Sequence, residues 1–144
     1  MSMQTNIQYG YGIITSHIKV EDIEKLKALI HRLPEYEKDL NAYFEAENIT
    51  EPTIKDYYTY MEDYNGLAGI FETLIYEEEG IELCACSDDN GDFYLLYPES
   101  YPWYMGKLDL SMTEDKLKQL FQRYVALLTD KQVDIGYQRC EKCG

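Results

Sequence analysis

Apolar residues recur along this chain at spacings that predict a strand, a run of helices, a hairpin, a further helix and a last strand. Residues 7–18 are typical of a strand, with Tyr9, Tyr11 and Ile13 on one face. Apolar residues then recur at helical spacing, as on one face of an amphipathic helix, over four ranges: 20–33, 34–48, 53–64 and 66–79. The last stripe is the clearest, and Gly80 stands where a glycine commonly ends a helix.

Residues 81–97 carry the clearest hairpin signal. Asn90-Gly91 is the favoured pair at the centre of a two-residue type I′ turn, in which both residues need a positive φ. The register set by such a turn places Cys86 opposite Leu95, on a face rich in apolar side chains. The sequence therefore predicts that at least part of the sheet is antiparallel.

The last part of the chain predicts one more helix and one more strand. Ser111 and Glu114 form a capping box at the start of a helical stripe over 112–129. A strand over 133–138 precedes a short tail, 139–144, which we expect to be flexible.

Together these elements predict an α+β fold for a single domain that spans residues 1–144. A small sheet of three to four strands, at least partly antiparallel, would be covered by four to five helices. Residues 101–104 are aromatic and fit either a loop or a short edge strand.

Charge adds a functional argument, because it is concentrated in the middle of the chain. Residues 35–99 contain 18 acidic side chains and only two basic ones, Lys38 and Lys55, whereas the flanks are close to neutral. The whole chain has a formal net charge of −14. A field of one sign repels itself and costs stability, so this pattern favours a surface that meets a basic partner. The same charge argues against direct binding to nucleic acid or to an anionic membrane.

Composition narrows the class of protein further. With 45% apolar residues and 15 tyrosines, the chain can bury a core and is not a disordered acidic tail. No apolar run approaches the ~20 residues of a membrane-spanning helix, and no signal peptide is recognisable at the start. Four cysteines in a chain of this size do not indicate a disulfide framework, so we expect a cytoplasmic protein.

The cysteines are the main candidates for metal chemistry. Cys140 and Cys143 have the two-residue gap of a zinc knuckle, and Cys84 and Cys86 could supply a second pair. The alternative, which we prefer, is a pair of buried structural cysteines and a pair of free thiols in a fraying tail. No helix follows the C-x-x-C pair, which disfavours a thioredoxin-like redox motif. We therefore predict no cofactor and no metal site.

No other motif indicates catalysis. Residues 88–92 are acidic, but aligning them with an EF-hand loop leaves both end positions without a calcium ligand. Gly10 and Gly12 lie inside a strand, where glycines mark a bulge or a close backbone approach rather than a dinucleotide site. His17 and His31 have no catalytic motif near them. We predict that the protein is not an enzyme and has no catalytic residues.

Three short strings, YGYGI at residues 9–13, GLAGI at 66–70 and YLLYPESYPW at 94–103, resemble segments of one class of proteins. These are the small, acidic, tyrosine-rich proteins of Gram-positive bacteria and their phages. The resemblance implies no fold or activity by itself, but it favours a small acidic inhibitor of the anti-CRISPR kind, which often covers the DNA-binding surface of a nuclease. Such inhibitors share no motif, so the resemblance assigns no role to any residue.

The leading hypothesis is a non-catalytic binding or inhibitor protein whose acidic central surface docks on a basic, nucleic-acid-binding partner such as a nuclease. Its predicted contact residues are acids with interleaved tyrosines: Glu45, Glu47, Asp56, Tyr57, Tyr58, Tyr60, Glu62, Asp63, Tyr64, Glu77, Glu78, Glu79, Glu82, Asp88, Asp89 and Asp92. The alternatives are a plain acidic cytoplasmic domain with a housekeeping role and a Cys-ligated zinc protein. Convergence of the acids on one surface would favour docking, and scatter would favour the plain acidic domain.

Overall fold

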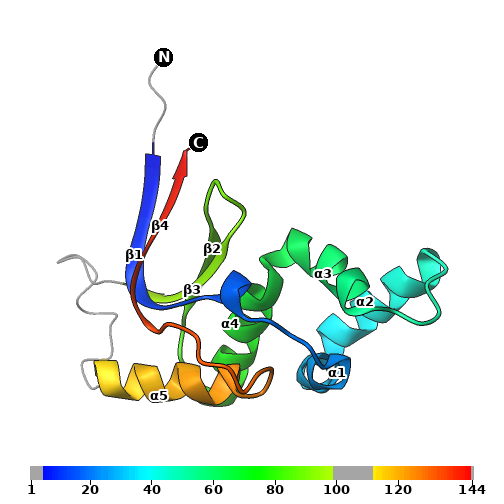
Figure 1. The fold of residues 1–144 in the computed structure, drawn as a ribbon. Helices are drawn as coiled ribbons and strands as arrows, with labels where there is room; N and C mark the ends of the chain where they lie inside the picture. The colour runs from blue at the N-terminus through cyan, green and yellow to red at the C-terminus, as the bar shows by residue number, and fades with distance from the viewer. Residues whose placement is uncertain (1–4, 99–111, 144) are drawn as a thin grey trace.

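A computed structural model describes residues 5–98 and 112–143 of the chain, and its fold is α+β, as the sequence predicts (Figure 1). Within these residues, five α-helices accompany one antiparallel sheet of four strands. The aromatic segment 101–104 lies outside the described residues.

The elements follow the predicted order, with ends that differ by a few residues. They are β1 Thr5–Ile14, α1 Ile23–His31, α2 Pro34–Ala46, α3 Ile54–Met61, α4 Gly66–Glu79, β2 Cys84–Ser87, β3 Phe93–Pro98, α5 Glu114–Val125 and β4 Gly136–Cys143. Two 3-10 turns, η1 Thr15–His17 and η2 Glu62–Tyr64, follow β1 and α3. The N-cap of α5 is Thr113, whose hydroxyl accepts a hydrogen bond from the Lys116 N–H. The predicted cap, Ser111, lies outside the described residues.

The sheet has the strand order β2-β3-β1-β4, with antiparallel neighbours throughout. β4 pairs with β1 from Gly136, opposite Gly12, to Cys143, opposite Thr5. The prediction that this strand ends at residue 138 was therefore wrong, because pairing with β1 extends the strand to Cys143. The sheet also curls, so that its two edge strands, β2 and β4, contact each other.

Two glycines of β1 allow the backbones of β1 and β3 to approach closely. A Cβ atom added at Gly12 would lie 2.0 Å from the carbonyl oxygen of Leu95, and one added at Gly10 would lie 2.6 Å from that of Tyr97. The predicted close backbone approach is thus confirmed, and it excludes every side chain at both positions.

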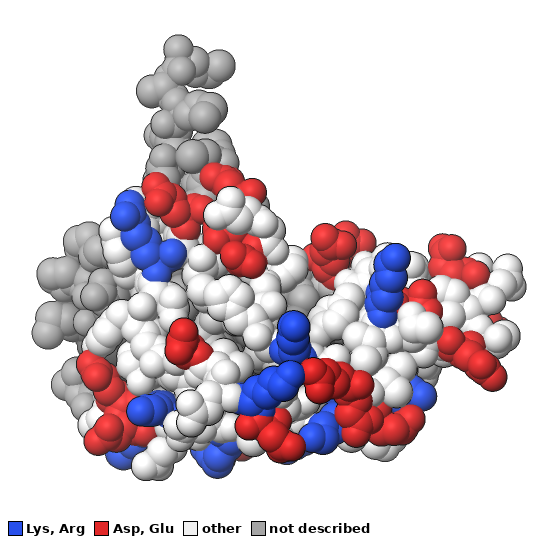
Figure 2. Space-filling model, viewed as in Figure 1, with Lys and Arg blue, Asp and Glu red and all other residues white. Residues whose placement is uncertain are grey.

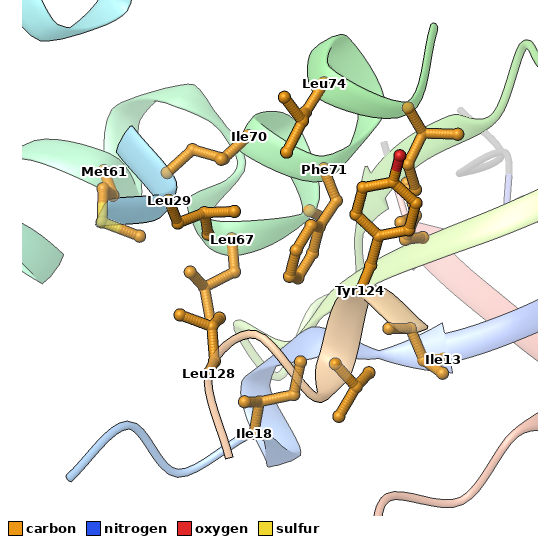
Figure 3. Close-up of a cluster of buried hydrophobic side chains, with 14 of the residues drawn as sticks. Ile13, Ile18, Leu29, Met61, Leu67, Ile70, Phe71, Leu74, Tyr124 and Leu128 are labelled. Atoms are coloured by element: carbon orange, nitrogen blue, oxygen red, sulfur yellow. The ribbon is translucent and has the colours of Figure 1, made fainter. Parts of the chain in front are cut away.

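The main core lies between the helices and one face of the sheet, with α4 at its centre (Figure 3). Ile13 of β1, Phe71 of α4 and Phe121 of α5 are each at most 1% exposed. Burying an apolar side chain of this size stabilises a fold by about 1.5–3 kcal/mol. Because α1, α2 and α3 add buried residues to the same cluster, the helices and the sheet share one continuous core.

The hairpin between β2 and β3 has a wider turn than the sequence predicts. Residues 88–92 connect the two strands, and the Asp88 N–H donates to the carbonyl oxygen of Asp92. Only Gly91 has a positive φ there, 84°, so the turn is not type I′. The Asp88 carboxylate accepts hydrogen bonds from the backbone N–H groups of Asn90 and Asp92, and these bonds fix the wider turn.

This turn shifts the strand register by one residue. Cys86 lies opposite Tyr94 instead of Leu95. Because successive side chains of a strand point to opposite faces, this shift places both β2 cysteines on the face of the sheet that points away from the main core. Cys86 there packs against a second, small core that includes Leu96 and Cys140. The prediction that the cysteines face the main core was therefore wrong.

Candidate functional site

The predicted contact residues lie in three separate parts of the molecule. One part is the segment 34–64, which comprises α2, α3, η2 and their connections. The second is the C-terminal end of α4 with the connection that follows it, where Glu82 lies, and the third is the β2–β3 turn (Figure 1). Figure 2 shows the acidic side chains of the viewed face in separate groups, with Lys or Arg near several of them. On this face the acids form no single continuous patch, so convergence of all the predicted contact residues on one surface is not seen there, and each group must be judged by its own contacts.

Two of the three acids in the last turn of α4, Glu78 and Glu79, are bonded to other parts of the fold. Glu78 accepts two hydrogen bonds from the Arg32 guanidinium, at 2.8 and 3.0 Å, and one from the Tyr124 hydroxyl at 2.8 Å. Glu79 accepts one from Arg123 at 2.9 Å. Burial and the bond to Glu78 raise the pKa of Tyr124 above its usual value. These acids join α4 to α5 and to the end of α1, which explains their presence without a partner.

Two other predicted contact residues also have local structural roles. Asp88 fixes the β2–β3 turn and accepts a hydrogen bond from the Tyr94 hydroxyl at 2.8 Å. Asp56 accepts bonds from the backbone N–H and the hydroxyl of Thr53, in a capping box at the start of α3. The remaining acids outside segment 34–64 are exposed or half-buried: Glu77, Glu82, Asp89 and Asp92.

Segment 34–64, here called the helical arm, keeps most of its charge available. It contains nine acidic and two basic residues. Seven of the acids are exposed and have neither an ion pair nor a hydrogen bond to any described residue: Glu35, Asp39, Glu45, Glu47, Glu51, Glu62 and Asp63. The helical arm thus holds more exposed acids without a bonded partner than any other part of the described chain.

Four tyrosines of the helical arm surround an open hollow, here called the tyrosine hollow. Its lining residues are Tyr36, Asp39, Ala42, Tyr43, Tyr60 and Tyr64. The Tyr60 ring lies at the centre of the group, with its centroid 5.1 Å from those of Tyr43 and Tyr64 and 5.8 Å from that of Tyr36. Tyr64 is 53% exposed, so one wall of the hollow faces solvent.

Helical spacing explains how these residues meet. Tyr36, Asp39 and Tyr43 are three and four residues apart on α2 and therefore share one face, while Tyr60 and Tyr64 are four residues apart across α3 and η2. The predicted contact residues include Tyr60 and Tyr64 but none of these three residues of α2. Their spacing was a usable signal, but it is equally typical of a core stripe.

The other two predicted tyrosines do not line the tyrosine hollow. Tyr57 is 7% exposed and packs edge-on against Phe44, with ring centroids 5.1 Å apart. Its assignment as a contact residue was therefore wrong, because it belongs to the core. Tyr58 is half-buried and lines a different groove, beside Lys55 and Glu62.

Burial keeps two tyrosines of the hollow, Tyr36 and Tyr60, in their neutral form. It raises the pKa of Tyr60 to about 12, and Tyr64 and Asp39 add to this effect. Burial also raises the pKa of Tyr36, whose hydroxyl oxygen is buried and has no hydrogen-bond partner among the described residues. At neutral pH these two tyrosines therefore present neutral rings and intact hydroxyl groups beside the Asp39 carboxylate.

Three cysteines gather on the second face of the sheet as free thiols. Cys86 of β2 lies within hydrogen-bond distance of Cys84 and of Cys140 on β4, and the bond with Cys86 lowers the pKa of Cys84 below its usual value. Among the described residues, no group of three or more His, Cys, Asp or Glu side chains is arranged to hold a metal ion. The side chain of Cys143, the fourth member of the predicted zinc set, lies outside the described part.

Comparisons with known proteins give no information on the function of this chain. No family model, no curated protein and no solved structure matches the chain. None of the helices in the described ranges is both long and apolar enough to cross a membrane. Function must therefore be inferred from the charges and contacts described above.

Proposed function

We propose that this protein is a non-catalytic binding protein that docks on a basic partner through its helical arm. One observation carries the proposal. Seven exposed acids of the arm have no ion pair or hydrogen bond with a described residue, whereas Glu78 and Glu79 are bonded to arginines. Uncompensated like charges repel one another and cost stability, so their concentration on one segment favours a role outside the fold.

The partner has the chemistry of a nucleic-acid-binding protein, such as a nuclease, and the docked protein acts as its inhibitor. Proteins that bind B-DNA surround its phosphates with Lys and Arg, and carboxylates on a folded surface can occupy the same groove. This mode is one that the resemblance to small, acidic, tyrosine-rich proteins of Gram-positive bacteria and their phages favours. Electrostatic attraction of this type accelerates association and weakens as salt is added.

A capture experiment with charge-matched variants tests the proposal. The immobilised protein is exposed at about 50 mM salt to a nuclease-treated extract of the source cells, and retained proteins are identified. The arm variant carries Glu62→Lys and Asp63→Lys. The control carries Asp130→Lys and Asp134→Lys, which change the net charge equally at exposed acids outside the arm.

We expect the wild-type protein and the control to retain a basic nucleic-acid-binding protein that duplex DNA displaces, and the arm variant to lose it. Equal retention by the two variants, or retention that DNA does not affect, would contradict the proposal. In the first case the acidic residues would act only as a solvated surface of a plain acidic domain.

A further inference from the structure

We infer that the tyrosine hollow is a binding site for one arginine side chain of the partner. The inference deepens the proposed function and rests on it, because it names the chemical group that the helical arm recognises. Aromatic rings attract cations over their faces, and a guanidinium is the cation that most often uses this interaction in proteins.

The charge around the hollow favours a cation. Among the described residues that line it, Asp39 is the only charged one, and none is Lys, Arg or His. Asp39 is exposed and has no ion pair or hydrogen bond with a described residue. Its carboxylate is therefore available for a ligand at the edge of the aromatic group.

Ring orientation suits a flat cation. The Tyr36 ring stands at 82° to Tyr60 and at 77° to Tyr64, so the rings form a corner. A planar guanidinium can stack on one wall of such a corner while its edge meets the other. Because Tyr64 is 53% exposed, the corner is accessible to a side chain from outside.

Hydrogen bonding distinguishes arginine from other cations. The guanidinium has five N–H donors in a planar fork, so two of them can bind the two oxygens of the exposed Asp39 carboxylate side by side. A trimethylated lysine has no N–H to donate, and an unmodified lysine has no flat face to stack. Arginine is thus the side chain that matches both the rings and the acceptors.

The test uses small capped amino acids as probes. Nα-acetyl-arginine amide is titrated into the full protein, and the ring signals of ¹³C-labelled tyrosines are followed by NMR. Nα-acetyl-citrulline amide, a neutral analogue of the same shape, and Nα-acetyl-lysine amide are the comparison ligands. We expect saturable shifts of the four hollow tyrosines with arginine, at least about threefold weaker binding of lysine, and no binding of citrulline.

Variants locate the binding. Asp39→Asn and Tyr64→Ala should each weaken arginine binding by about fivefold or more, and Tyr64→Phe should retain most of it. Tyr76→Ala is the matched control, because Tyr76 of α4 is 54% exposed and lies outside the hollow. It should leave arginine binding unchanged. Circular dichroism confirms that each variant is folded.

The outcomes separate this inference from the proposed function. Ring signals that do not move with arginine up to about 20 mM, or binding unaffected by both Asp39→Asn and Tyr64→Ala, would overturn the arginine site. The docking proposal would then stand if the arm variant still lost its partner. Conversely, arginine binding in the hollow together with equal capture by the arm variant and its control would overturn docking through the arm.

Discussion

Removing the carboxylate of Glu78 should destabilise the fold, although the sequence places this acid in the surface that meets a partner. Tyr124 is 6% exposed, and its hydroxyl donates to Glu78 at 2.8 Å. In the Glu78→Ala variant this hydroxyl loses its charged acceptor within the protein. Arg32 loses both of its hydrogen bonds to the same carboxylate.

The magnitude follows from the burial of each contact. A hydrogen bond to a charged group contributes about 1.5–3 kcal/mol to stability. The bond from Tyr124 to Glu78 should lie in this range, because Tyr124 is buried. The pair with Arg32 is partly exposed, with side chains 40% and 31% exposed, so it adds only about 0–1 kcal/mol. We expect Glu78→Ala to lower the free energy of unfolding by about 2–3 kcal/mol.

Urea unfolding followed by circular dichroism measures this loss, provided that the slope of the transition is unchanged. Glu77→Ala is the matched control, because Glu77 is exposed in the same last turn of α4 and has no bond to a described residue. Its effect should stay within about 0.5 kcal/mol. In a double-mutant cycle, Glu78→Ala should lower the free energy of unfolding by less in the Tyr124→Phe background than in the wild type. Equal effects of the two alanine variants would refute the structural role of Glu78.

Three further predictions concern the backbone and the tyrosines. Gly12→Ala should lower the free energy of unfolding by about 1–3 kcal/mol or more, because its Cβ would lie 2.0 Å from the Leu95 carbonyl oxygen. Gly91→Val should cost about 1–3 kcal/mol, because Gly91 has φ 84°, whereas Asn90→Ala should cost less. Both are checked by urea unfolding, and wild-type stability would contradict them. The contribution of Tyr60 to stability should be constant up to about pH 10 and then be lost towards pH 12, because Tyr60 ionises near 10 when unfolded and near 12 when folded. Ultraviolet titration of phenolate absorbance checks this, and ionisation of every tyrosine near pH 10 would contradict it.

The helices were predictable because their determinants are local. The stripe of α4 repeats at helical spacing, and Gly80 ends the helix with φ 71°, the conformation that glycine adopts at least cost. Both signals lie within one stretch of sequence, and the helix ends where they place it. The sheet needed information from distant residues. β4 extends to Cys143 because β1 offers it a partner, and nothing near β4 in the sequence shows that pairing.

The hairpin shows how one side chain can override a strong local signal. Asn90-Gly91 favours a type I′ turn, but the Asp88 carboxylate binds the N–H groups of Asn90 and Asp92 and stabilises a longer connection. The register then shifts by one residue and the cysteines change face. The effect of a side chain that binds backbone N–H groups is difficult to predict from sequence, because it depends on the conformation of the whole turn.

The excess of acidic residues at the candidate site could be predicted from the sequence, but the contacts of these acids and of the tyrosines could not. The density of acids in the middle of the chain is a property of the sequence, whereas the arginines that bind Glu78 and Glu79 come from α1 and α5. Likewise, the spacing of Tyr36 and Tyr43 on α2 fits a core stripe as well as a surface. Only the packing of α2 against α3 brings these rings to an open hollow.

The measurement that tests the central claim most directly is the salt dependence of affinity for the captured partner. Dissociation constants are determined at about 50 and 300 mM salt for the wild type, the arm variant with Glu62→Lys and Asp63→Lys, and the control with Asp130→Lys and Asp134→Lys. We predict that wild-type and control affinities agree and weaken by about tenfold or more at the higher salt, while the arm variant binds weakly at both. Affinities that are equal for the two variants, or unchanged by salt, would contradict docking through the helical arm.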